Sequence, residues 1–180
     1  MTKKIQPWSV VRELGRDDHR IFRLKTLEVA DPRNGATYPR VVLEAGDWVN
    51  VVAVTTAGEA VLVRQFRFGT WSDTLEIPGG MVDAGESPQT AAVRELEEET
   101  GYRAGRVLSM GFTHPNPAIL DNKLHHFVAL ECVQVHAGAQ EASEDIAIEL
   151  VPRAELENLV RSGEINHSLV LAALYLDTLR

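Results

Sequence analysis

The segment from Ser87 to Gly101 fixes the position of one helix, because both of its ends are marked in the sequence. Ser87 is a residue type that caps helix N-termini, and Pro88 follows at the first helical position, where its missing N–H costs nothing. Gly101 is the residue expected just past the C-terminus, so we predict a helix that runs to about Thr100. The face of this helix that would pack on other elements consists of Ala92, Val93, Leu96 and Thr100.

Short apolar segments separated by turn residues predict strands on both sides of this helix. Strands outnumber helices and are mixed with them, so the predicted fold class is α/β, with a mixed sheet flanked by helices. We expect residues 1–45 to form a strand-rich N-terminal extension and residues 46–180 to form the main domain. The predicted strands are Ile21–Val29, Val41–Ala45, Val49–Thr55, Ala60–Phe68, Thr74–Ile77, Val107–Phe112, Leu124–Val135 and Ile146–Val151. The strand Thr74–Ile77 should end at Pro78-Gly79-Gly80, where Gly79-Gly80 would form a tight turn. Further predictions are a helix from Pro152 to about Arg161 and a terminal helix over His167–Leu179.

The charge balance disfavours a long nucleic acid as a partner. The 180 residues include 18 lysines and arginines against 26 aspartates and glutamates, a net charge of −8, and no basic block is visible. The apolar runs are too short to span a bilayer, and the N-terminus does not have the pattern of a secretory signal. We therefore expect a cytoplasmic protein without a membrane partner. A single cysteine, Cys132, excludes an intramolecular disulfide and is expected in the core.

Three glutamates, Glu95, Glu98 and Glu99, share one face of the predicted helix, and we call them the glutamate stripe. At about 5.5 Å and an effective dielectric constant near 20, each pair costs on the order of 3 kcal/mol before screening. Side chains splayed into water would relieve this repulsion, and the stripe would then be a solvated acidic face. Alternatively, Mg²⁺ or Mn²⁺, which prefer oxygen ligands, would neutralise it. Arg94, four residues before Glu98, can orient a carboxylate.

The residues around the stripe resemble a known family pattern. Gly80, Glu86 and the run Arg94-Glu95-Leu96-Glu97-Glu98-Glu99-Thr100-Gly101-Tyr102 stand at the spacing of the box of the Nudix hydrolases. Tyr102 is the one departure, since an aliphatic residue is more usual there. The resemblance implies an α/β/α sandwich around a mixed sheet, and hydrolysis of a nucleoside diphosphate linked to another moiety.

The resemblance also implies roles by motif position. The implied metal ligands are Glu95, Glu98, Glu99 and the carbonyl of Gly79. Glu86 would support the site, and Arg94 would hold the glutamates in place. We assign Glu98 and Arg94 to the catalytic group, because bound divalent ions would lower the repulsion between hydroxide and diphosphate.

A general base outside the box should take the proton of the attacking water. In relatives that cleave ADP-ribose, this base comes from a loop shortly before the last strand, which corresponds here to the acidic residues 141–145. Glu144 is our assignment, and Glu141, Asp145 and Glu149 remain alternatives. A solvated acidic loop without a catalytic role is the competing interpretation.

Residues that flank the box resemble the ADP-ribose pyrophosphatases and related hydrolases of nucleoside diphosphate sugars. Leu75-Glu76-Ile77-Pro78-Gly79-Gly80 is similar to their entry sequence, and Pro117, sixteen residues after Gly101, is similar to their marker proline. We therefore expect Glu76 and Pro117 to bind substrate. Arg64-Gln65-Phe66-Arg67 is also similar to that group, in which the arginines face the substrate phosphates. Arg64 and Arg67 point to opposite faces of a regular strand, so Arg67 is the better candidate.

The leading hypothesis is hydrolysis of ADP-ribose to AMP and ribose 5-phosphate with Mg²⁺ or Mn²⁺ as cofactor. One alternative is hydrolysis of another nucleoside diphosphate sugar such as GDP-mannose, and another is a non-catalytic nucleotide-sensing module on the same fold. The strand-rich N-terminus resembles the element through which such enzymes form homodimers, so a homodimer is expected.

Overall fold

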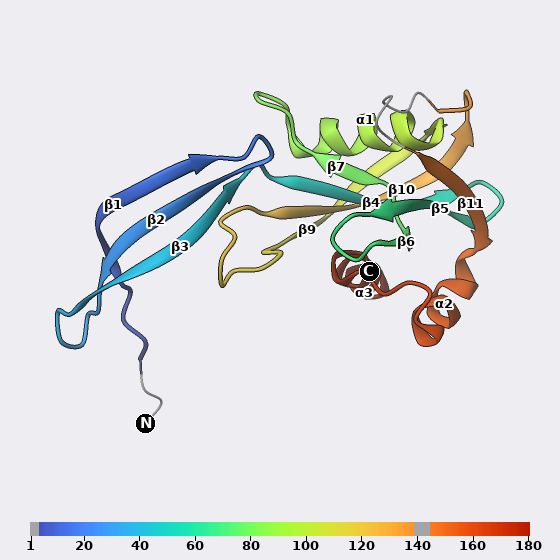
Figure 1. The fold of residues 1–180 in the computed structure, drawn as a ribbon. Helices are drawn as coiled ribbons and strands as arrows, with labels where there is room; N and C mark the ends of the chain where they lie inside the picture. Colours follow the sequence, from blue (N-terminus) through green and yellow to red (C-terminus); the bar gives the residue numbers. More distant parts are fainter. Residues whose placement is uncertain (1–3, 139–144) are drawn as a thin grey trace. The chain divides into compact units, whose positions relative to one another are not determined.

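The computed structural model describes residues 4–138 and 145–180, which belong to two compact units (Figure 1). The larger unit comprises the described residues of Asp47–Thr113 and Lys123–Arg180. The smaller unit comprises the described residues up to Gly46 together with His114–Asn122, a loop from the middle of the chain. Within the described ranges, no helix is both long and apolar enough to cross a membrane.

Three antiparallel strands form the sheet of the smaller unit, in the order β1-β2-β3. They are β1 (Ser9–Asp18), β2 (Phe22–Ala30) and β3 (Thr37–Ala45). The connection from β2 to β3 turns at Asp31, whose carboxylate accepts a hydrogen bond from the Arg33 backbone N–H at 2.8 Å. Leu43 of β3 forms a β-bridge with Leu120, which ties the loop His114–Asn122 to this sheet.

An eight-stranded mixed sheet forms the centre of the larger unit, with the main order β11-β5-β4-β10-β8. In addition, β6 pairs with β5, β7 with β4 and β9 with β10. Strands β4 and β10 run parallel, and the remaining pairs are antiparallel. The strands are β4 (Trp48–Thr55), β5 (Glu59–Arg67), β6 (Ser72–Glu76), β7 (Gly79–Met81), β8 (Tyr102–Arg103), β9 (Arg106–Thr113), β10 (Leu124–Gln134) and β11 (Ile146–Pro152).

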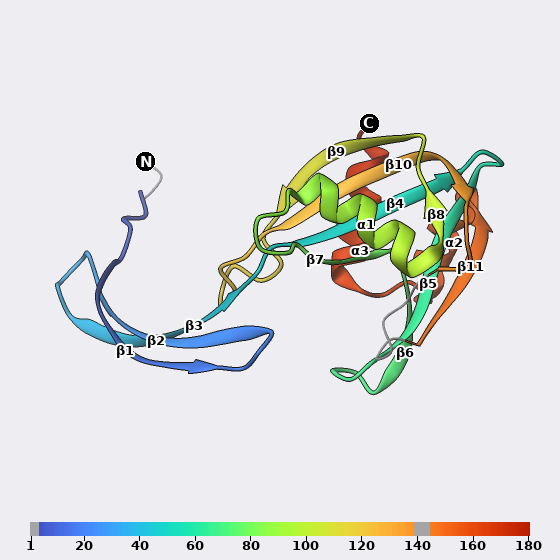
Figure 2. The same ribbon diagram turned by 90° about the horizontal axis from the view of Figure 1, so that it is seen from above.

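Each face of this sheet carries a helical layer (Figures 1 and 2). Helix α1 (Pro88–Thr100) covers one face, and α2 (Leu156–Ser162) and α3 (Ser168–Thr178) cover the other; the short helix η1 (Arg153–Glu155) precedes α2. Alternate residues of β4 pack against the two helical layers. Val51 packs in the cluster that holds Leu96 of α1, and Val52 packs with Val170 of α3. The predicted α/β fold, a sandwich of helices around a mixed sheet, is confirmed.

Two local predictions are wrong. Strand β6 ends at Glu76, before Pro78, but Gly79-Gly80 do not form a tight turn, because residues 79–81 form strand β7 against Trp48–Asn50 of β4. A Cβ on Gly79 would lie 2.3 Å from the carbonyl oxygen of Val49, so this close strand approach requires glycine. Val93 was expected in the core, but it remains 38% exposed on the outer side of α1.

Candidate active site

Helix α1 carries the glutamate stripe, and both of its predicted ends are confirmed. The Ser87 hydroxyl accepts a hydrogen bond from the Thr90 backbone N–H at 3.1 Å, as an N-cap does. At the other end, Gly101 has a φ of 72° and donates its N–H to the Glu97 carbonyl at 2.8 Å. A Cβ there would lie 2.0 Å from the His136 carbonyl oxygen, so only glycine fits this helix end. The two caps fix where the helix begins and ends, and they thereby fix the direction in which the glutamate stripe faces.

Two glutamates of the stripe lie against the glycines of β7. The Glu99 carboxylate is almost fully buried and accepts a hydrogen bond from the Gly79 backbone N–H at 2.9 Å. The Glu95 carboxylate occupies the space above Gly80, where a Cβ would lie only 2.4 Å from its Oε1 atom. Glu98 is about half exposed. The paired glycines therefore form a cradle for two carboxylates at the start of the box.

Arg94 holds the carboxylates of the site together. Its Nε and Nη2 atoms donate to the two oxygens of Glu86 at 3.1 and 3.0 Å, in bidentate geometry. Its Nη1 atom donates to Glu95 at 2.9 Å and to Glu98 at 3.0 Å, while Nη2 also donates to the Met81 carbonyl at 3.0 Å. These hydrogen bonds, led by those to Glu86, raise the pKa of Arg94, and the same contacts lower the pKa of Glu86. The guanidinium offsets part of the repulsion within the stripe, but carboxylates still outnumber it.

The chemistry of these side chains fits a hard divalent cation. Mg²⁺ and Mn²⁺ prefer carboxylate oxygens, and the stripe offers three carboxylates, two of which lie against the glycines of β7. In the part of the chain that the structure describes, no three acidic, histidine or cysteine side chains converge into a ready-made cation site. The Arg94 guanidinium binds both Glu95 and Glu98, while Glu99 is bound to the Gly79 N–H. A bound cation would therefore compete with Arg94 for the carboxylates.

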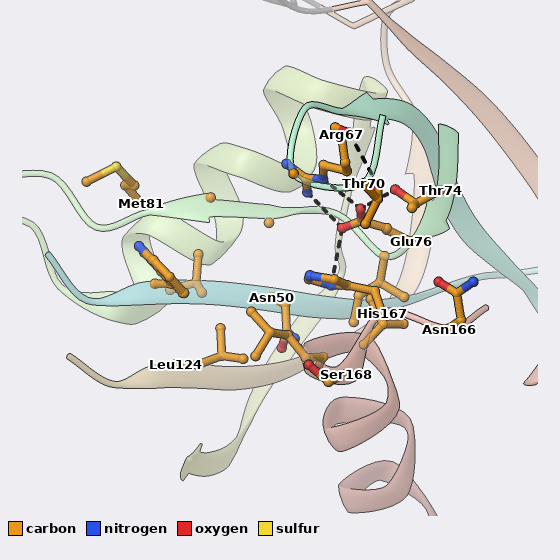
Figure 3. Close-up of a pocket in the computed structure, with 18 residues that line it drawn as sticks. Asn50, Arg67, Thr70, Thr74, Glu76, Met81, Leu124, Asn166, His167 and Ser168 are labelled. Carbon is orange, nitrogen blue, oxygen red and sulfur yellow. Dashed lines mark hydrogen bonds and ion pairs between the residues drawn. The ribbon is translucent and has the colours of Figure 1, made fainter. Parts of the chain in front are cut away.

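A cavity of about 660 Å³ lies beside strand β7, within the size range of small-molecule sites. It lies between β4, the β6–β7 region and the start of α3, and Figure 3 shows its lining. Gly79 and Gly80 line the cavity as well as contacting the glutamates, so strand β7 is common to both. The side chains labelled in Figure 3 are Asn50, Arg67, Thr70, Thr74, Glu76, Met81, Leu124, Asn166, His167 and Ser168.

Glu76 and Arg67, two predicted substrate ligands, are paired in this cavity. Arg67 donates from Nε and Nη2 to the two oxygens of Glu76, each at 2.7 Å, and the Thr74 hydroxyl donates to Glu76 Oε1 at 2.6 Å. The Nδ1 atom of His167 lies 3.5 Å from Glu76 Oε2 (Figure 3). Burial alone would raise the pKa of Glu76, but the hydrogen bonds from Arg67 and Thr74 outweigh burial and hold the pKa below its ordinary value. Glu76 is therefore ionised and anchors Arg67 at the cavity wall.

Sequence reasoning missed a buried polar chain behind the cavity. Asn50 interrupts the apolar strand β4, donates from Nδ2 to the Leu169 carbonyl at 3.0 Å, and contacts His126 Nδ1 through Oδ1 at 2.8 Å. The Nε2 atom of His126 lies 2.9 Å from the Thr113 hydroxyl. Burial, and then the charge of His125, lower the pKa of His126 to about 4, so the ring is neutral at pH 7. The polar Asn50 in an otherwise apolar strand was the available signal.

The remaining predicted site residues are Arg64, Pro117, Glu144 and the alternatives to Glu144. Arg64 does not line the cavity, and each of its three guanidinium nitrogens donates to a different carboxylate. Pro117 is an exposed residue of the smaller unit. Glu144 and its alternative Glu141 lie outside the described residues. The alternative Glu149 accepts a hydrogen bond from Arg64 Nε at 2.5 Å, so it already has a cationic partner.

Comparison with known proteins agrees with this geometry. A NUDIX domain model matches residues 46–174. An ADP-ribose pyrophosphatase of Bacillus subtilis (strain 168) is 35% identical over 134 residues, which cover 73% of this chain and 72% of that protein. A GDP-mannose pyrophosphatase of Escherichia coli (strain K12) is 29% identical over 179 residues, which cover 94% of this chain and 86% of that protein. The crystal structure of an ADP compounds hydrolase superposes with a TM-score of 0.84 over 98% of this chain and 95% of that chain, and at 22% identity this supports the fold alone.

The chain therefore belongs to the NUDIX domain family, because the match spans well over half of its length. The resemblance seen in the sequence is confirmed. Family and relatives together indicate that the protein is an enzyme, a pyrophosphatase, and enzymes of this family generally need divalent metal ions.

Proposed function

We propose that the protein hydrolyses the diphosphate bond of ADP-ribose to AMP and ribose 5-phosphate, with Mg²⁺ or Mn²⁺ as cofactor. The observation that carries this proposal is the position of β7. Its two glycines contact Glu95 and Glu99 on α1, and the same two glycines line a cavity of about 660 Å³. A ligand in the cavity would thus have its diphosphate within reach of the stripe.

Glu95, Glu98 and Glu99, with the carbonyl of Gly79, would hold the divalent ions. Such ions, when bound, neutralise the diphosphate and lower the pKa of a coordinated water. Arg94 holds Glu95 and Glu98 together through hydrogen bonds of 2.9 and 3.0 Å, and a bound ion would take over part of these contacts.

We propose Glu144 as the general base that takes the proton from the attacking water. The described residue Gly138, which precedes its loop, supports this proposal. A Cβ on Gly138 would lie 3.2 Å from the Glu99 carbonyl oxygen and 3.4 Å from that of Glu98. The chain therefore enters the acidic loop beside the end of α1 that carries the stripe. Asp145 and Glu141 remain alternatives.

The cavity supports a nucleotide sugar as substrate. Arg67 presents a guanidinium at the wall, and the bidentate hydrogen bonds to Glu76 fix its orientation. We therefore assign Arg67 and Glu76 to substrate binding, with Arg67 as the group that meets phosphate or sugar oxygens and Glu76 as its anchor. The relative from Bacillus subtilis, 35% identical, is an ADP-ribose pyrophosphatase, which favours ADP-ribose.

GDP-mannose is the second candidate substrate. The Escherichia coli GDP-mannose pyrophosphatase is less similar, at 29% identity, but its match extends over 94% of this chain. Both candidates place a diphosphate between a nucleoside and a sugar, so the same stripe would serve either.

A panel of nucleotide sugars tests the proposal. Purified protein is incubated with Mg²⁺ and each compound, and release of phosphomonoester is measured. We expect the highest kcat/KM for ADP-ribose, no turnover in excess EDTA, and recovery when Mg²⁺ is restored. Glu99→Gln keeps an oxygen that can accept from the Gly79 N–H but loses the charge, so kcat should fall roughly 10²- to 10³-fold.

Glu97→Gln is the matched control, because Glu97 lies on the same helix but pairs with Arg103 at 2.7 Å outside the stripe. Its turnover should match that of the wild type. Equal turnover of ADP-ribose and GDP-mannose would remove the substrate assignment. Tight binding of ADP-ribose without any turnover would instead indicate the non-catalytic sensing module.

We also propose that the protein is a cytoplasmic homodimer in which the smaller unit provides contacts. The support is that β1 exposes Val10, Val11 and Leu14, with 62, 52 and 46% of their surfaces accessible. Exposed apolar side chains on an edge strand favour contact with another chain. Light scattering at micromolar concentration measures the mass, and a value near the 19.9 kDa of one chain would reject the dimer.

A further inference from the structure

Arg64 of β5 forms a hub with three carboxylates outside the cavity. Its Nε donates to Glu149 of β11 at 2.5 Å, its Nη1 to Asp73 of β6 at 2.9 Å, and its Nη2 to Glu164 at 2.6 Å. Its side chain is only 28% exposed. All three nitrogens thus already have anionic partners, and this arrangement differs from that of an arginine held ready for a substrate phosphate.

The Glu164 contact is the one that connects the hub to the cavity. Glu164 lies between α2, which ends with the left-handed Gly163, and α3, whose N-cap is His167. Ile165 is 1% exposed and donates its N–H to the Leu159 carbonyl at 3.0 Å. Only one residue separates Glu164 from Asn166, the first of five successive residues that line the cavity. Residues 164–168 are thus anchored by Ile165 on the core side and by Arg64 on the outer side.

Arg67 and Arg64 of β5 therefore support the same wall of the cavity from opposite sides. Arg67 reaches Glu76, which lies 3.5 Å from His167, and Arg64 reaches Glu164, three residues before His167. Because residues three apart on a strand face opposite ways, the two arginines do not compete for partners.

We propose that Arg64 is a positioning residue: through Glu164 it fixes residues 166–168 at the cavity wall and so sets the affinity for the nucleotide sugar. Arg64 touches no substrate in this role. The kinetic part of the inference rests on the proposed function, whereas the structural link between Arg64 and residues 164–168 does not.

The test compares Arg64→Gln, Glu164→Gln and the double variant, with Asp73→Asn as the matched control. Asp73 shares Arg64 as a partner, is 64% exposed, and belongs to β6 rather than to the segment that follows α2. We expect both single variants to raise KM for ADP-ribose roughly tenfold while kcat stays within about twofold. The double variant should raise KM no further, since both changes break one contact. Asp73→Asn should leave KM unchanged.

Hydrogen exchange of the ligand-free proteins provides a second readout. The amides of Ile165 and Val170, whose hydrogen bonds to Leu159 and His167 hold the segment, should exchange roughly tenfold faster in both single variants. Melting temperatures should fall by at most about 4 °C, because the contacts are partly exposed. If Arg64→Gln fails to fold, Glu164→Gln alone carries the test.

Two results would overturn the inference. The first is unchanged exchange of Ile165 and Val170 in Glu164→Gln. The second is a wild-type KM for Glu164→Gln beside a large loss of kcat for Arg64→Gln, which would make Arg64 a direct phosphate ligand. If no nucleotide sugar is hydrolysed, the proposed function fails, and the exchange measurement still decides the positioning role.

Discussion

Replacing Gly80 with alanine should separate activity from stability at the centre of the site. A Cβ on Gly80 would lie 2.4 Å from Glu95 Oε1, 2.5 Å from Cδ and 2.7 Å from Oε2. An ordinary contact needs about 3.4 Å or more, so the carboxylate has to move by about 1 Å. The obstructed atoms are the end of a flexible side chain, and the fold should lose no more than about 1 kcal/mol. If Glu95 holds a metal ion as proposed, a displacement of that size can cost about 10²-fold in kcat.

Gly79→Ala is the matched variant one residue earlier. Its Cβ would meet backbone, at 2.3 Å from the Val49 carbonyl oxygen and 2.9 Å from the Asn50 Cα. Backbone cannot turn aside, so β7 would have to separate from β4, at a cost of about 1–3 kcal/mol or more. For a chain of this length, each kcal/mol lowers Tm by about 2–4 °C.

The assay measures kcat for ADP-ribose with Mg²⁺ and the melting temperature of both variants. Gly80→Ala should melt near the wild type and turn over about a hundredth as fast, whereas Gly79→Ala should melt several degrees lower. Full activity of Gly80→Ala would refute the argument that Glu95 must occupy the space above Gly80. Equal destabilisation of both variants would show that the two glycines serve the same structural purpose.

Two further predictions concern the cavity. Because folding lowers the pKa of Glu76 below 4.5, its ionised form stabilises the fold above that pH, and the contribution is lost as the pH falls through the lowered value. Glu76→Gln should therefore lower the free energy of unfolding at pH 7 by about 1–2 kcal/mol. This is less than the loss expected for a fully buried ion pair, because Arg67 is partly exposed. Thermal melts should show that the difference in melting temperature from the wild type shrinks below pH 4.5. Asn50→Ala removes the partner of both His126 and the Leu169 carbonyl, so urea unfolding should show a loss of about 1–3 kcal/mol; an unchanged midpoint would show that water replaces the amide.

Local signals were sufficient for most of the secondary structure. The ends of α1 follow from Ser87, Pro88 and Gly101, which act within one turn of the helix, and the central strands follow from continuous apolar runs. Strand β1 was missed because its apolar residues, Val10, Val11 and Leu14, do not alternate with polar residues at every second position. Strand β7 was missed because glycine pairs are read as turns, and only the backbone of β4 beside it makes them a strand.

The contacts at the site likewise divide into those that the sequence predicts and those that it does not. The spacing of the box implied that Arg94 lies with Glu86, Glu95 and Glu98, and the structure brings these side chains together. The partners of the two β5 arginines were not readable, because Glu76 and Glu164 are chosen by strand pairing and by the path of the chain between α2 and α3. The role of each residue in turnover stays a prediction.

The sequence by itself determined the glutamate stripe, the helix that carries it and the family to which the chain belongs, because these depend on residue types within about two dozen neighbouring positions. Tertiary structure alone decided which residues lie opposite the glutamate stripe and its helix. It placed the β7 glycines under Glu95 and Glu99, joined Arg67 to Glu76 and His167, and gave Arg64 three carboxylates instead of a place in the cavity. The physical reason is that a side chain's partners across a sheet are set by strand order and register, which arise from the packing of the whole core.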